Sequence, residues 1–71
     1  MRKGITVEVG NTYKRRDGLE AFVYFKNPRT QDYDCVIVGQ NAIFFNVDEN
    51  GFYFGKIDKE SQNDLVAVIQ D

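Results

Sequence analysis

Apolar and polar residues alternate along most of this chain, in short runs that turn residues separate at intervals of roughly ten positions. The runs are rich in β-branched and aromatic side chains. None of them repeats apolar residues with the spacing of an amphipathic helix over three turns. An alternation of period two is typical of strands that bury one face. The pattern therefore predicts an all-β domain of five or six short antiparallel strands.

The predicted strands are separated by polar or glycine-containing segments. They are residues 11–15, 19–26, 33–38, 42–47, 52–57 and 65–70, preceded by a short lead strand over residues 5–9. Residues 27–32 are expected to form a loop, because Pro28 cannot donate to a strand ladder and the segment is polar. Residues 58–64 are predicted to be a polar loop that can include one helical turn. A helix over 59–69 is an alternative, although Val66, Val68 and Ile69 favour a strand.

The first hairpin turn contains Arg16, Asp17 and Gly18, and the hydrophobic pattern tests its length. A two-residue loop would place Lys14 on the apolar face of the hairpin. A three-residue loop pairs Lys14 with Glu20 and gives Tyr13 the same face as the apolar positions of the next strand. Since a slip of one residue inverts every side chain, the pattern favours three residues, with Gly18 left-handed in a bulge.

The second turn is predicted over residues 48–51 by the same reasoning. A four-residue loop sets Val47 opposite Phe52 and Phe45 opposite Phe54, whereas a three-residue loop would set Phe45 opposite Gly55. The first arrangement pairs two aromatic rings across the strands, which stabilises a sheet.

These registers predict a hydrophobic core and a fold. The core is expected to contain Val7, Tyr13, Leu19, Ala21, Val23, Phe25, Ile37, Ile43, Phe45, Val47, Phe52, Phe54, Leu65, Ala67 and Ile69. Short strands in this number suit a small SH3-like barrel or a strongly bent antiparallel sheet. We expect one domain over residues 1–71, with residues 1–4 flexible.

Composition and charge narrow the class of protein. Hydrophobic residues make up 42% of the 71 positions, which is ample for a core and argues against disorder. The net charge is −2, but residues 1–29 carry seven basic and three acidic side chains, while residues 30–71 carry two basic and eight acidic ones. Such asymmetry suits either an anionic partner for the basic half or a mixed solvated surface.

Residues that could carry catalysis are scarce. The chain has no histidine and one cysteine, so a zinc or haem site, an internal disulfide and a histidine-activated nucleophile are not expected. Asp34 beside Cys35 would raise the pKa of the thiol, and we expect Cys35 to be a packed core residue. The acidic pairs Asp32/Asp34 and Asp48/Glu49 are interpreted as solvated turn residues. We therefore predict a non-enzymatic protein without a cofactor or metal, in a reducing cytoplasm, and no run of apolar residues is long enough to span a membrane.

The core assignment leaves an outward strip as the candidate binding site. Its predicted members are the aromatic residues Phe22, Tyr24, Phe44 and Tyr53, rimmed by Arg15 and Lys26. Three interpretations are open. The rings form a second core layer, they pack on a partner protein or a second copy of the chain, or they stack the bases of single-stranded nucleic acid. The net negative charge disfavours nucleic acid, because such binding depends on many cations.

Several motifs resemble those of small proteins encoded by tailed bacteriophages and enterobacterial prophages. The chain reads Val9-Gly10-x-x-Tyr13-x-x-Arg16-Asp17-Gly18-x-x-Ala21-x-Val23, then Asn50-Gly51-Phe52-Tyr53, and finally Asp64-Leu65-Val66. The resemblance covers about residues 7–69. Asn50 stands where aspartate is common, and residues 27–42 match poorly.

The resemblance implies a phage or prophage accessory protein in the host bacterial cytoplasm, and it brings no catalytic residues. The sequence therefore predicts a small interaction module that binds a host or phage protein or itself. A single-stranded nucleic-acid-binding domain is the alternative.

Overall fold

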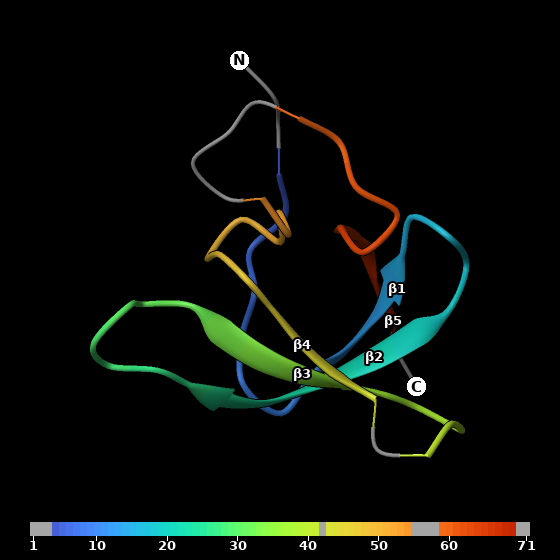
Figure 1. Ribbon diagram of the computed structural model, residues 1–71, viewed down its shortest axis with the longest axis horizontal. Coiled ribbons are helices and arrows are strands. Elements are labelled where there is room, and N and C mark those ends of the chain that lie inside the picture. Colours follow the sequence, from blue (N-terminus) through green and yellow to red (C-terminus); the bar gives the residue numbers. More distant parts are fainter. Residues whose placement is uncertain (1–3, 42, 55–58, 70–71) are drawn as a thin grey trace.

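Five antiparallel strands in one sheet make up the regular structure of the computed structural model (Figure 1), which describes residues 4–41, 43–54 and 59–69. The strands are β1 (Thr12–Arg15), β2 (Glu20–Lys26), β3 (Tyr33–Ile37), β4 (Phe44–Val47) and β5 (Leu65–Ile69). Five of the predicted strands are thus confirmed, each within two residues at its ends. The segment 59–64, for which a helical turn was an alternative, contains no helix.

The strands lie in the order β4-β3-β2-β1-β5. The first four form consecutive hairpins, and β5 joins the sheet beside β1 at the other edge. Within the described ranges, β4 and β5 do not pair with each other, so the sheet is bent and open and does not close into an SH3-like barrel. Figure 1 shows β2 and β3 crossing in the lower part of the molecule, with the turn after β4 and the loop before β5 above them.

The first hairpin has the predicted register. Tyr13 pairs with Ala21 and Lys14 pairs with Glu20. The Gly18 amide donates to the Arg15 carbonyl at 3.0 Å, and Gly18 has φ of 93°. A three-residue loop with a left-handed glycine therefore connects β1 and β2.

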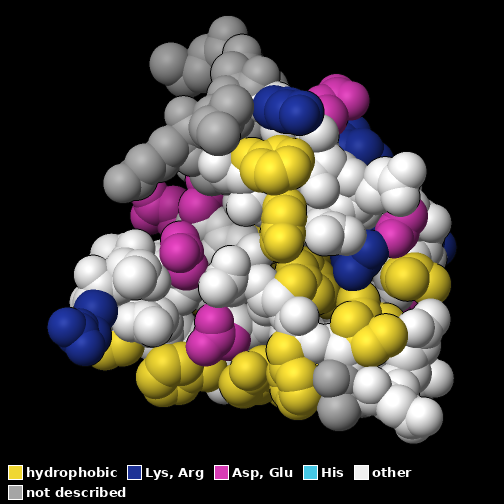
Figure 2. All heavy atoms as spheres, in the orientation of Figure 1, with side chains coloured by type: hydrophobic (Ala, Val, Ile, Leu, Met, Phe, Trp, Pro, Cys, Tyr) yellow, Lys and Arg dark blue, Asp and Glu magenta, His cyan; other side chains and the backbone are white. Residues whose placement is uncertain are grey.

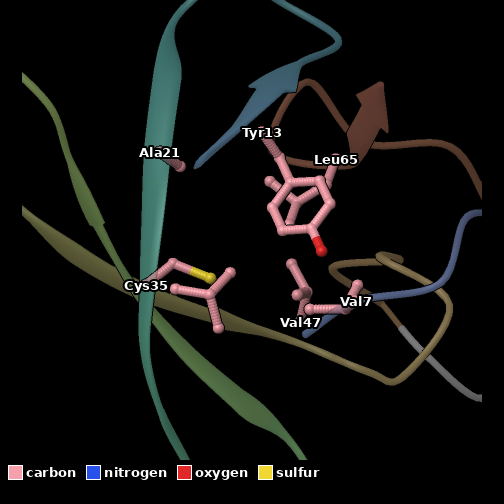
Figure 3. Close-up of a cluster of buried hydrophobic side chains, with 7 residues drawn as sticks. Val7, Tyr13, Ala21, Cys35, Val47 and Leu65 are labelled. Atoms are coloured by element: carbon pink, nitrogen blue, oxygen red, sulfur yellow. The ribbon is translucent and has the colours of Figure 1, made fainter. Parts of the chain in front are cut away.

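One face of the sheet is covered by irregular chain from two places, residues 4–11 and residues 48–54. The amides of Ile5 and Val7 donate to the carbonyls of Asn50 and Glu49, so the two segments are held together. Beneath them lies a cluster of buried side chains (Figure 3): Val7, Tyr13, Ala21, Val23, Cys35, Val47 and Leu65. We call this side the covered face and the opposite side the outer face.

Tyr13 fastens the N-terminal segment across the covered face. Its ring is 1% exposed, and its hydroxyl donates to the Thr6 carbonyl at 3.2 Å. The same oxygen accepts the Glu8 amide at 2.8 Å and the Asn11 side-chain amide at 3.2 Å. Each of these groups would otherwise need water, so the hydroxyl both satisfies them and fixes the path of residues 6–11.

Two β-bulges change which side chains face the core. In β2 the register shifts between Val23 and Phe25, so Phe25 pairs with Asp34 and lies on the outer face. In β5 the shift leaves Val66 unpaired and sets Ala67 opposite Lys14. The prediction that Phe25 and Ala67 belong to the core is therefore wrong, because an extra residue in a strand inverts the alternation that follows it. For the same reason Ile69 is half-buried on the outer face.

The predicted second hairpin is wrong. The turn exists, since the Gly51 amide donates to the Asp48 carbonyl at 3.0 Å and Gly51 has φ of 85°. However, residues 52–54 form no strand, and β4 pairs with β3. The Asp48 side chain accepts the amides of Asn50 and Phe52, and the Gly51 carbonyl accepts the Leu65 amide. These bonds direct the chain toward β5 instead of back along β4.

Other expected core and strand positions also differ. Residues 5–9 are irregular instead of forming a strand. Leu19, Ile43 and Phe54 are exposed at positions next to turns, while Phe45 packs half-buried against the core. The remaining predicted core residues are buried: Val7, Tyr13, Ala21, Val23, Ile37, Val47, Phe52 and Leu65. Of the expected flexible residues, 1–3 lie outside the described ranges, as do positions 42, 55–57 and 70 of the predicted strands.

Two glycine substitutions test the turns. A Cβ at Gly18 would have open space, so Gly18→Ala should cost only the positive φ, about 1 kcal/mol. At Gly51 a Cβ would lie 3.0 Å from the Leu65 carbonyl oxygen, so Gly51→Ala should cost about 2 kcal/mol or more. Chemical denaturation measures both. Equal stability of Gly18→Ala and the wild type would contradict the turn, and equal losses at both sites would contradict the close packing at Gly51.

Candidate interaction surface

A row of outward-facing side chains crosses the outer face from one edge strand to the other. Thr12 pairs with both Phe22 and Ile69, Phe22 pairs with Val36, and Val36 pairs with Phe44. Since directly paired residues point to the same side of a sheet, the five side chains form a continuous band. Thr12 is its one polar member.

Aromatic rings dominate the part of this face that β2 and β4 form. Phe22, Tyr24, Phe25 and Phe44 are 36%, 43%, 48% and 60% exposed, whereas Val23 between them is fully buried. The rings of Tyr24 and Phe44 meet edge to face with centroids 6.0 Å apart. Figure 2 shows hydrophobic side chains along the lower margin of the molecule, below the strands as Figure 1 presents them. We call the rings of Phe22, Tyr24, Phe25 and Phe44 the aromatic patch.

The structure brings together three members of the predicted strip, Phe22, Tyr24 and Phe44. Tyr53 lies elsewhere. It follows the turn after β4, its amide donates to Asp64, and its ring contacts Phe54 at 5.2 Å between centroids. Tyr53 was expected beside the others because residues 52–57 were expected to pair with β4.

The two predicted rim cations lie on the covered side. Lys26 pairs with Tyr33 and its Nζ lies 5.5 Å from the centroid of that ring. Arg15 shares the buried face with Tyr13 and is 8% exposed. Its guanidinium stacks 5.0 Å from the Phe45 ring centroid and donates to Asp17 and Asn63. The expectation that Arg15 and Lys26 border the strip is therefore wrong.

Few charges remain near the aromatic patch. By register the outer face carries Lys14 opposite Glu20 at one end, and Asp34 opposite Phe25 at the other. Arg16 pairs with Asp64 at 3.2 Å. Among the described basic residues, only Lys14 belongs to the outer face of a strand, so the strand positions beside the patch carry balanced or negative charge.

A buried carboxylate organises the loop that precedes β5. Asp64 is fully buried, and its Oδ1 accepts the Tyr53 amide at 2.8 Å. Its Oδ2 accepts the Ser61 amide at 3.0 Å and the Arg16 guanidinium at 3.2 Å. One side chain thus ties together the loop before β5, the turn after β4 and the β1–β2 turn.

The hydrogen bonds of Asp64 decide its ionisation. Burial alone would raise the pKa of Asp64, but the amides of Ser61 and Tyr53 and the Arg16 guanidinium hold the pKa below its usual value. The pKa of Asp17 is lowered in the same way, against burial, by the Arg15 guanidinium and the Leu19 amide. Both carboxylates are therefore charged structural acceptors.

Other chemistry is limited in the part of the chain that the structure describes. Burial, with a smaller effect of Asp34, raises the pKa of the Cys35 thiol to about 12, so it is protonated at neutral pH and lies in the core as expected. No group of three or more cysteine, aspartate or glutamate side chains among the described residues could hold a metal ion. Across the same residues there is no helix of the length and apolarity that a membrane span requires.

Sequence reasoning missed Phe25, Val36 and Ile69 on the outer face and the burial of Asp64. The bulges leave no clear signal in the alternation, so Phe25 and Ile69 could not be assigned to this face, whereas Val36 could have been, because it alternates with the predicted core residue Ile37. Asp64 did carry a signal, because an acidic residue directly before an apolar strand often caps a turn. Comparison of the chain with protein-family models, curated proteins and solved structures gives no match.

Asp64→Asn tests the buried carboxylate. The amide would turn an NH2 group toward at least one of the donors that Asp64 now accepts, so we expect a loss of about 3 kcal/mol at pH 7. Because the folded pKa of Asp64 is depressed, its contribution is complete above the unfolded pKa, about 3.9, and is lost as pH falls through the folded pKa. The stability of the variant should therefore fall less in acid than that of the wild type.

Urea denaturation at pH 7 and at pH 3 measures both effects. Glu49→Gln is the control, because its side chain is exposed and its change should stay within about 0.5 kcal/mol. Parallel acid losses in the wild type and Asp64→Asn would contradict this role of Asp64.

Proposed function

We propose that this protein is a non-enzymatic interaction module that docks the outer face of its sheet on an apolar protein surface. The observation that carries the proposal is the aromatic patch on a sheet face that the described chain leaves uncovered. Monomeric proteins rarely expose a contiguous apolar patch larger than a few hundred Å² without using it for binding. Aromatic residues at the centre of an interface also supply much of its binding energy.

A second core layer is a poorer account of these rings. Phe44 is 60% exposed, and the segments 4–11 and 48–54 pack against the opposite face. The side chains buried beneath them point away from the aromatic patch.

Single-stranded nucleic acid also has less support than a protein partner. Stacking of bases on exposed rings normally works together with cations that hold the phosphates. Here the Arg15 guanidinium pairs with Asp17, and the Arg16 guanidinium pairs with Asp64. The Lys26 ammonium lies over the Tyr33 ring. Asp34 shares the outer face with the patch. The strand positions of this face thus offer a phosphate backbone one lysine, Lys14, together with the acidic Glu20 and Asp34.

The resemblance to small phage and prophage proteins supplies a setting for the proposal. It rests on turn and core positions, such as Gly18, Tyr13 and Asp64, which the structure uses to build the fold. We therefore propose an accessory protein of the bacterial cytoplasm, with the outer face as the part that meets its partner.

A capture experiment tests this function. Immobilised wild type, Phe22→Thr/Phe44→Thr and the control Phe54→Thr are incubated with bacterial lysate. Threonine retains the preference for strands, and Phe54 is an exposed ring outside the patch. Proteins that bind the outer face should be retained by the wild type and by Phe54→Thr, at low and high salt, and lost from the double variant.

The proposal would be contradicted if all three proteins retained the same lysate proteins and the wild type also showed no self-association through the patch. A titration with single-stranded oligonucleotide at low salt should show no binding. Binding that depends on Phe22 and Phe44 would favour the nucleic-acid alternative instead.

A further inference from the structure

Asp34 places a carboxylate on the outer face, among the rings of the aromatic patch. It pairs with Phe25 on one side and with Asn46 on the other, and its side chain is half-buried. In the described part of the chain this carboxylate accepts no hydrogen bond and forms no ion pair, whereas Asp17 and Asp64 each accept backbone amides. A half-buried charge without a donor has lost part of its hydration, so the position favours a cation from outside.

Aromatic rings border this carboxylate on both neighbouring strands. Phe25 is directly opposite Asp34 on β2, and Phe44 is a diagonal neighbour, because it precedes Asn46 by two positions on β4. Both places are within reach of a large side chain. Tyr24 meets the Phe44 ring at an interplanar angle of 75°, so these two rings turn their faces in different directions. A cation here would be attracted by the negative charge and by the ring faces together.

The covered side of the same protein shows how such a combination holds an arginine. The Arg15 guanidinium lies 5.0 Å from the Phe45 ring centroid and donates to the Asp17 carboxylate. The outer face offers the same two kinds of group, but the one described base on its strands, Lys14, lies opposite Glu20 at the other end of the face. No described cation of the chain therefore occupies the equivalent place on the outer face.

We propose that the partner of the outer face presents an arginine, which stacks on the aromatic patch and donates to Asp34. The inference rests on the proposed function and names the group that the partner carries. Arginine suits the place better than lysine, because its planar guanidinium can stack on a ring and donate its fork of N–H groups to a carboxylate at the same time. Apolar groups beside the arginine would cover the remaining rings.

A double-mutant cycle between the protein and a peptide tests the proposal. The probes are acetyl-Leu-Arg-Leu-amide and the same peptide with citrulline, which has the shape of arginine but no charge. Nuclear magnetic resonance titration at millimolar peptide should show binding through the ring signals of Tyr24, Phe25 and Phe44. The wild type should bind the arginine peptide about five-fold more tightly than the citrulline peptide. Asp34→Asn should bind the two equally, since the cycle isolates the contact between the two charges.

Two variants and a third peptide serve as controls. Glu20→Gln should retain the preference for arginine, because Glu20 is an exposed acid at the other end of the same face. Phe22→Thr/Phe44→Thr should weaken the binding of both peptides, since both would contact the rings. A lysine peptide should bind more weakly than the arginine peptide. Far-ultraviolet circular dichroism confirms that each variant is folded, and the comparison of peptides on the wild type requires no variant.

Absence of binding, or equal affinity of the wild type for the arginine and citrulline peptides, would overturn the proposal. A preference for arginine that survives in Asp34→Asn would overturn it too, and a lysine peptide bound as tightly as the arginine peptide would exclude the guanidinium as the group recognised. If the capture of lysate proteins still depends on Phe22 and Phe44 after any of these results, the inference fails and the proposed function stands.

Discussion

The structure depends on how little chain is available to cover a five-stranded sheet. Two irregular segments, 4–11 and 48–54, pack over one face, and the hydroxyl of Tyr13 holds the first of them in place. Asp64 holds the second by accepting the Tyr53 amide and connects it to β5. Because both segments are used on the same side, the described chain has no layer for the other face. The apolar character of that face is therefore the feature that calls for a functional explanation.

The polar residues that support the covered face are satisfied by one another. Arg15 is buried against Phe45, but its guanidinium meets Asp17 and Asn63. No buried side-chain nitrogen or oxygen in the described residues lacks a hydrogen-bond partner. Buried charges are costly unless they are paired, so this network explains how a small core can tolerate an arginine and an aspartate. It also engages two of the basic side chains, Arg15 and Arg16, in ion pairs within the fold.

Much of the fold was predictable from local pattern. The register of the first hairpin followed from Lys14 and Glu20, since a slip would have placed a lysine on the apolar face. The outer position of Phe22 followed from the same register. Phe25 and Ala67 were not predictable, because a β-bulge is set by the geometry of the assembled sheet and leaves the alternation of the sequence unchanged. Tyr53 was misplaced because hydrogen bonds to Asp48 and Asp64, distant in the pattern, direct the chain after β4.

The central claim is that the described chain covers the sheet on one side only and that the bulge in β2 turns Phe25 toward the bare side. The most direct measurement is the attenuation of side-chain signals by an inert paramagnetic agent, recorded by nuclear magnetic resonance on dilute wild-type protein. The account predicts strong attenuation for Phe22, Phe25 and Phe44 and little for Val23 and Val47. Protection of Phe25 equal to that of Val23 would contradict it, because both faces of the sheet would then be covered.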